Sequence, residues 1–133
     1  MDTKILILTH GGWGRELLKS IEMIIGHIDF VEEIPLLPNA TFKEYYSEVQ
    51  HYVKSMNMKI ILFTDMFGGT TTNVGAKVAN EENLKIITGL NAPLLLEACS
   101  QLLFQGEINF EALINVTRSS SFDVLEKIKE GQR

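Results

Sequence analysis

KILILTHGGWG, residues Lys4–Gly14, is the stretch from which the fold of this chain is predicted. Four apolar residues, Ile5 to Leu8, lead to Thr9 and His10 and then to a glycine-rich turn. A short, unbroken apolar run beside a glycine cluster is typical of a buried strand in a parallel sheet, with the turn leading into a helix. His10 is therefore expected at the carboxyl end of the first strand, the edge at which open α/β sheets bind ligands.

A second stretch of the same kind is KIILFTDMFGG, residues Lys59–Gly69, in which an apolar strand ends at Asp65 and a glycine pair. The first and third strands of doubly wound sheets commonly adjoin, so we expect His10 and Asp65 to meet. If Asp65 accepts a hydrogen bond from one ring nitrogen of His10, the other nitrogen keeps a free lone pair. A nucleophile with an orienting carboxylate and no obvious third catalytic residue suits a group carrier better than a hydrolase.

Size and composition narrow the class of protein. With 133 residues, 45% of them hydrophobic and 22% charged, the chain is expected to form a single globular domain over residues 1–133. The formal net charge of −5 argues against a nucleic-acid partner. The apolar runs are too short to span a bilayer and the N-terminus lacks a signal-peptide layout, so a cytoplasmic location is expected. The single cysteine, Cys99, excludes an internal disulfide and is predicted to be a small core residue.

Strand and helix patterns alternate along the chain. An amphipathic helix follows the first strand and ends at Gly26. Further strands are expected at Ile28–Leu37, closed by Pro35 and Pro38, and at Ile60–Thr64 and Leu84–Thr88. This order predicts an α/β fold with a doubly wound, mainly parallel four-stranded sheet and helices on both faces.

Capping signals mark the later helices. Thr41 and Glu44 match the capping box of the second helix. The three threonines Thr70–Thr72 are expected to supply N-caps for the third. Asn91 and Asn109 are expected to cap the helices that follow the fourth strand.

Two nucleotide-binding motifs are disfavoured. The dinucleotide fingerprint requires a third glycine where Leu17 stands, and no P-loop ending is present. The turns can still present backbone N–H groups to an anion. The other two histidines, His27 and His51, are expected on the surface, and the sequence predicts no metal site and no cofactor.

Three turns together resemble those of a known family. They are Thr9-His10-Gly11 after the first strand, Asp65-x-x-Gly68-Gly69-Thr70 after the third and Gly89-x-Asn91-x-Pro93 after the fourth. They are similar to the signature turns of the enzyme IIA component of the mannose-type family of the bacterial phosphoenolpyruvate-dependent sugar phosphotransferase system. The resemblance covers nearly the whole chain, and the three turns in combination are specific.

The resemblance implies a phosphotransferase component that works through a phosphohistidine. His10 would take a phosphoryl group from the carrier HPr and pass it to a histidine of enzyme IIB, driving sugar uptake through the membrane components. Nε2 of His10 would be the nucleophile, and Asp65 would hold Nδ1. The residues implied to cradle the phosphate are Phe67, Gly68, Gly69 and Thr70.

The resemblance also implies a homodimer, because members of the family exchange a C-terminal antiparallel strand. Residues 121–128 would form that strand, and no fused IIB domain is expected. The residues themselves leave the tail ambiguous. Phe122, Leu125 and Ile128 fit a helix, whereas Phe122 and Val124 fit a strand.

Two departures from the family pattern stand close to these turns. Thr71 occupies a position where many relatives carry proline, and phosphate binding is expected to survive because proline is favoured but not required at a helix start. Gly12 and Gly14, on either side of Trp13, are less usual and are expected to loosen the turn after His10. The sequence does not indicate which sugar is transported.

Three alternatives remain open. The phosphotransferase subunit of a dihydroxyacetone kinase also carries phosphate on a histidine after the first strand, but the Gly68 and Gly89 turns favour the sugar system. A regulatory module controlled by phosphorylation of His10 is disfavoured because no DNA-binding segment is visible. The last alternative is a flavodoxin-like ligand-binding protein without phosphate chemistry.

Overall fold

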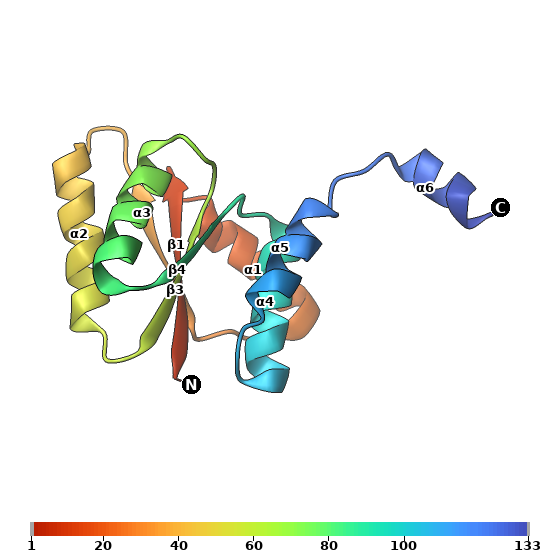
Figure 1. The fold of residues 1–133 in the computed structure, drawn as a ribbon, viewed down its shortest axis with the longest axis horizontal. Helices are drawn as coiled ribbons and strands as arrows, with labels where there is room; N and C mark the ends of the chain where they lie inside the picture. The colour runs from red at the N-terminus through yellow and green to blue at the C-terminus, as the bar shows by residue number, and fades with distance from the viewer. Residues whose placement is uncertain (1, 133) are drawn as a thin grey trace.

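The computed structural model describes residues 2–132 and contains one four-stranded parallel sheet (Figure 1). The spatial order is β2-β1-β3-β4. The strands are β1 (Thr3–His10), β2 (Val31–Leu36), β3 (Lys59–Thr64) and β4 (Lys85–Thr88). Because β1 pairs directly with β3, with Leu8 opposite Thr64, the residues that follow both strands emerge side by side.

Helices cover both faces of the sheet. They are α1 (Gly14–Ile25), α2 (Phe42–Ser55), α3 (Thr70–Glu82), α4 (Ala92–Gln105), α5 (Phe110–Arg118) and α6 (Val124–Gly131). Figure 1 shows α2 and α3 on one face and α1, α4 and α5 on the other, which confirms the predicted doubly wound α/β fold. None of the helices within residues 2–132 has the length and hydropathy needed to cross a bilayer.

The alternation of side chains along β1 divides the core into two layers. Ile5 and Ile7 face the layer that contains residues of α1 and α4, and Leu6 and Leu8 face the layer under α2 and α3. Cys99 is fully buried in the first layer, as predicted. Burial raises the pKa of its thiol to about 12, so the thiol stays protonated and unreactive at neutral pH.

Three of the predicted helix caps are confirmed. The Thr41 hydroxyl accepts a hydrogen bond from the Glu44 N–H at 3.1 Å, and the Glu44 carboxylate accepts one from the Thr41 N–H at 3.0 Å. The Asn91 and Asn109 side chains each accept a hydrogen bond in the first turn of α4 and α5. These ends are encoded by residues within four positions of one another.

The predicted threonine caps of α3 are wrong. The residue at the N-cap is Gly69, which has no side chain to accept a hydrogen bond. Thr71 and Thr72 lie inside the first turn, and their hydroxyls donate instead to Asp65 and to the carbonyl of Met66. The helix therefore begins with its N–H groups uncapped by a side chain.

β2 is shorter than the predicted span of 28–37, and Pro35 lies inside it rather than closing it. Pro35 is opposite Thr9 of β1. Proline is tolerated there because β2 is an edge strand whose outer side needs no donor. Before the strand begins, the Phe30 carbonyl already accepts a hydrogen bond from Ile5 N–H at 2.9 Å.

The C-terminal strand expected at residues 121–128 is not present, because residues 124–131 form helix α6. The Asp123 carboxylate caps this helix by accepting a hydrogen bond from the Glu126 N–H at 3.0 Å. A helix satisfies its own backbone groups, whereas a strand needs a neighbouring edge. Figure 1 shows α6 extending away from the sheet, and its apolar side chains Leu125 and Ile128 are exposed. The homodimer remains a prediction.

Candidate functional site

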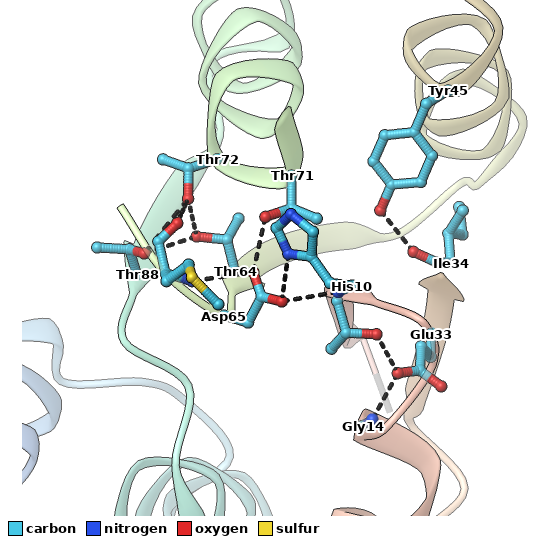
Figure 2. A network of polar contacts seen from close by, with 12 residues as sticks. His10, Gly14, Glu33, Ile34, Tyr45, Thr64, Asp65, Thr71, Thr72 and Thr88 are labelled. Atoms are coloured by element: carbon cyan, nitrogen blue, oxygen red, sulfur yellow. Dashed lines mark hydrogen bonds and ion pairs between the residues drawn. The ribbon is translucent and has the colours of Figure 1, made fainter. Parts of the chain in front are cut away.

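His10 and Asp65 meet at the carboxyl edge of the sheet, as the sequence predicts. Nδ1 of His10 lies 2.8 Å from Oδ2 of Asp65, and the His10 backbone N–H donates to the same oxygen at 2.7 Å (Figure 2). A carboxylate only accepts hydrogen bonds, so Nδ1 is the protonated ring nitrogen. In the neutral ring this leaves Nε2 with a free lone pair.

The two side chains differ sharply in exposure. The His10 side chain is 42% exposed, whereas that of Asp65 is 1% exposed. A shallow pocket opens beside the ring, lined by His10, Gly11, Leu36, Leu37, Pro38, Ala40 and Thr70. The His10 ring is therefore open to solvent, while the carboxylate that orients it is buried.

Asp65 is held in its charged form by hydrogen bonds. Burial raises the pKa of its carboxyl, but the Thr71 hydroxyl and the backbone and ring N–H groups of His10 outweigh burial and bring the pKa below its ordinary value. The Thr71 hydroxyl donates to Oδ1 at 2.7 Å, and the Met66 N–H donates to the same oxygen at 2.9 Å. A negative charge is thus fixed beside Nδ1 at neutral pH.

The turn after β3 is reinforced by a cluster of threonine hydroxyls. Thr64 and Thr72 have hydroxyl oxygens 2.7 Å apart, and Thr64 donates to Thr88 at 2.9 Å. Thr72 also donates to the Met66 carbonyl at 2.5 Å. Figure 2 shows this cluster joining the ends of β3 and β4 to the start of α3. It ties the backbone around Asp65 to both strands.

The residues predicted to hold phosphate lie on the turn after Asp65 and at the first residue of α3. A Cβ added at Gly69 would lie 3.0 Å from Cε1 and 3.4 Å from Nε2 of His10, so the ring rests against the Gly69 backbone. Thr70 lines the pocket beside His10. Gly68 adopts a left-handed φ of +89°, and the Phe67 side chain is 84% exposed. The first N–H groups of α3 have no intrahelical partner and can bind an anion.

Glu33 on β2 is part of this edge and was missed by the sequence analysis. Its carboxylate accepts hydrogen bonds from the Thr9 hydroxyl at 2.5 Å and from the Gly14 N–H at 2.6 Å (Figure 2). A Cβ at Gly14 would overlap this carboxylate. Gly14 therefore leaves room for the Glu33 carboxylate to reach the backbone, and the expectation that Gly12 and Gly14 loosen the turn stays a prediction. Helix α1 lacks a capping side chain of its own, which is the signal that could have pointed to a remote acceptor.

The remaining histidines lie outside the site. The side chain of His27 is 83% exposed and pairs with Glu22 at 3.2 Å, and His51 is exposed on α2. Within residues 2–132, no three or more His, Cys, Asp or Glu side chains gather in a way that could hold a metal ion.

Comparison with known proteins identifies the family. A family model described as the fructose IIA component of the phosphotransferase system (PTS) matches residues 4–117. The chain is 27% identical over 100 residues to the PTS mannose-specific EIIAB component of Escherichia coli strain K12. That match covers 73% of this chain and 31% of the relative, so the chain spans about a third of that protein.

Two further relatives have lengths close to that of this chain. The PTS fructose-specific EIIA component of Bacillus subtilis strain 168 is 26% identical over 136 residues, 94% of this chain and 90% of that protein. A solved structure from Streptococcus pneumoniae, the PTS IIA protein associated with the fucose utilization operon, has a TM-score of 0.79 at 28% identity. That likeness covers 96% of this chain and 97% of the other. The resemblance seen in the three turns is thereby confirmed, and the chain belongs to the PTS IIA family of the mannose and fructose type.

Proposed function

We propose that this chain is the phosphoryl carrier of a mannose-type sugar PTS, in which His10 takes a phosphoryl group from phospho-HPr and passes it to a histidine of enzyme IIB. The observation that carries the proposal is the geometry of His10, whose Nδ1 is 2.8 Å from the buried Asp65 carboxylate while the side chain is 42% exposed. An imidazole with one nitrogen oriented and the other free is a nucleophile. Membership of the family supports this role.

The transfer step follows from this arrangement. The Nε2 lone pair of His10 forms a bond to phosphorus as the bond between phosphorus and the HPr histidine breaks. The electron pair of the broken bond returns to the HPr ring, and the Nδ1 proton stays between His10 and Asp65. The positive charge that develops on the His10 ring is stabilised by the Asp65 carboxylate. Transfer to enzyme IIB repeats the step with His10 as the leaving group.

The transferred phosphoryl group would bind on the turn before α3. The backbone N–H groups of Phe67, Gly68, Gly69 and Thr70, with the Thr70 hydroxyl, would donate to its oxygens. Because α3 begins without a capping side chain, the positive end of its dipole is available to the phosphate. Thr71, in the position where many relatives carry proline, leaves this helix start intact and donates a hydrogen bond to Asp65.

The proposal also names the partners and the location. HPr and enzyme IIB would dock in turn at His10 in the cytoplasm, and the membrane sugar-transport components would receive phosphate through IIB. The chain would act as a single domain within a homodimer.

The homodimer is supported by exposed apolar side chains around α6, namely Phe122, Leu125 and Ile128. Light scattering tests it, and a stable monomer would contradict it.

The decisive experiment supplies phosphoenolpyruvate with labelled phosphate, enzyme I and HPr. The wild-type chain should become labelled, the His10→Ala variant should not, and the His51→Ala variant should be labelled like wild type because His51 is exposed on another element. An unlabelled wild type would refute the carrier role. Passage of label to a IIB supports the sugar system, passage to a dihydroxyacetone kinase subunit supports that alternative, and retention supports a regulatory module.

A further inference from the structure

The N-terminus of helix α1 is capped by a side chain of strand β2 and not by its own N-cap residue. The N-cap residue Trp13 provides no side-chain acceptor. Glu33 of β2 replaces it: one carboxylate oxygen accepts from the Gly14 N–H at 2.6 Å, and the other accepts from the Arg15 N–H at 3.1 Å. A carboxylate at this place satisfies two orphan donors and complements the helix dipole.

The same carboxylate also contacts the other end of the turn. The oxygen that accepts from Gly14 accepts from the Thr9 hydroxyl at 2.5 Å. Thr9 is fully buried and immediately precedes His10. Glu33 therefore bridges residues 9 and 14, and His10 lies between the two points that it holds.

The backbone between these points is intrinsically loose. Gly11 and Gly12 have φ values of +76° and +93°, which only glycine adopts readily, and glycine loses the most conformational entropy on ordering. A hydrogen bond from the Gly11 N–H to the Leu36 carbonyl at 2.9 Å is the backbone contact that ties this pair to β2. The contacts of Glu33 limit the movement of the turn on both sides of it.

We propose that Glu33 is a positioning residue for phosphoryl transfer at His10, acting through Thr9 and the Gly14 backbone without touching the reacting atoms. The inference rests on the proposed function. It matters for the chemistry because the ring is packed against Gly69, where an added Cβ would come within 3.4 Å of Nε2. A small displacement of the turn would therefore move Nε2 relative to the phosphate-binding turn, and misplacement by an ångström can cost a large factor in rate.

The variants Glu33→Ala and Glu33→Gln test this proposal, with Glu32→Gln as a matched control. Glu32 is the adjacent carboxylate of β2, but it faces outward and pairs with Lys4 at 2.7 Å. Glutamine can keep an oxygen where Thr9 and Gly14 donate, and it loses only the contact with Arg15. Glu33→Ala should lower kcat for transfer from phospho-HPr by about tenfold or more with KM little changed. Glu33→Gln should stay within about threefold of wild type.

The variant Thr9→Val separates positioning from general stability. It removes the hydroxyl that Glu33 accepts from, so it should slow transfer in the wild-type background and add little in the Glu33→Ala background. The NMR signal of the His10 Nδ1 proton should shift or broaden in both single variants. If Glu33→Ala fails to fold, Thr9→Val decides: a slowed rate supports the proposal, and a wild-type rate overturns it.

The outcomes distinguish this inference from the proposed function. If the wild-type chain accepts no label from phospho-HPr, the proposed function fails. If the wild type is labelled and folded Glu33→Ala transfers at the wild-type rate, only the positioning role is overturned. A rate that falls merely in proportion to the fraction of unfolded protein, at an unchanged kcat per folded molecule, also overturns it.

Discussion

The turn after β1 and the turn after β3 meet where the Asp65 carboxylate accepts hydrogen bonds from the backbone and the ring of His10, yet they are stabilised in different ways. In residues 9–14 the acceptors come from other parts of the chain: Asp65, the Leu36 carbonyl and Glu33. In residues 65–72 the threonine side chains of the turn itself bond Asp65 and Met66. The first turn depends on tertiary contacts, whereas the second is largely self-contained.

This difference matches the task of each turn. The first presents an exposed imidazole on a glycine-rich backbone, so hydrogen bonds from other parts of the chain must hold it in place. The second presents a buried charge and an open helix start, both of which need a rigid backbone. If this comparison is correct, changes in the second turn should act mainly on the chemistry of His10. Changes around the first should act on the placement of His10 and on stability.

The largest effect is expected from Asp65→Ala. Loss of the carboxylate removes the group that fixes the proton on Nδ1 of His10, and we expect phosphorylation to slow by about 100-fold. The fold should survive because the core clusters do not include this residue. Rapid-quench measurement of labelled His10, alongside circular dichroism, checks both statements. An unchanged rate of phosphorylation would show that Asp65 only caps the turn.

Gly69→Ala should have the next largest effect. The φ of Gly69 is −101°, which alanine adopts without strain, but the new methyl group would lie 3.0 Å from Cε1 of His10. The ring must tilt or shift, so transfer should slow by about tenfold or more while the free energy of unfolding changes little. Gly131→Ala is the control, since no other atoms lie near that position. Equal rates in the two variants would show that the ring tolerates displacement.

Thr71→Val tests how the second turn keeps Asp65 charged. The substitution removes the hydroxyl that lowers the Asp65 pKa, so the pKa should rise, stability should fall by about 1 to 2 kcal/mol at neutral pH, and transfer should slow a few-fold. Thr71→Ser keeps the hydroxyl, so its stability and its transfer rate should both be close to those of the wild type.

The loss of stability in Thr71→Val should depend on pH. Because the folded pKa of Asp65 is lowered, its ionised form adds stability above the ordinary value of 3.8, and this contribution is lost as the pH falls through the lower folded value. The stability gap between wild type and Thr71→Val should therefore be largest at neutral pH and shrink in acid. Denaturant unfolding at several pH values measures it, and a gap independent of pH would contradict this account.

The contrast between the turns also explains what could be predicted from the sequence. The four strands, the adjacency of the first and third strands and the pairing of His10 with Asp65 were predictable, because apolar runs and glycine turns are local signals and parallel strands end at a common edge. The capping box of α2 and the asparagine caps of α4 and α5 were predictable for the same reason. The tail was predicted as a strand from the resemblance, whereas the spacing of Phe122, Leu125 and Ile128 also fitted the helix that forms there, which Asp123 caps.

The contacts that were missed join residues far apart in the chain. Glu33 is 24 residues from Thr9 and 19 from Gly14, so no short motif contains them. Thr71 was interpreted as a candidate N-cap and as a substitute for proline, whereas its bond to Asp65 depends on how the turn folds back. Gly14 was interpreted only as a residue that makes the turn flexible. Because it has no Cβ, the Glu33 carboxylate can reach the backbone there.

The last prediction, Gly14→Ala, concerns the first turn and is measured as a change in stability. Alanine suits a first helical turn better than glycine, but its methyl group would overlap the Glu33 carboxylate and lie 3.0 Å from Ile7. Displacing the carboxylate should lower the free energy of unfolding, measured by chemical denaturation, by about 1 to 3 kcal/mol. In the Glu33→Ala background the overlap is gone, so the same substitution should cost much less. An equal cost in both backgrounds would place the strain at Ile7 and would mean that the first turn does not depend on Glu33 for its shape.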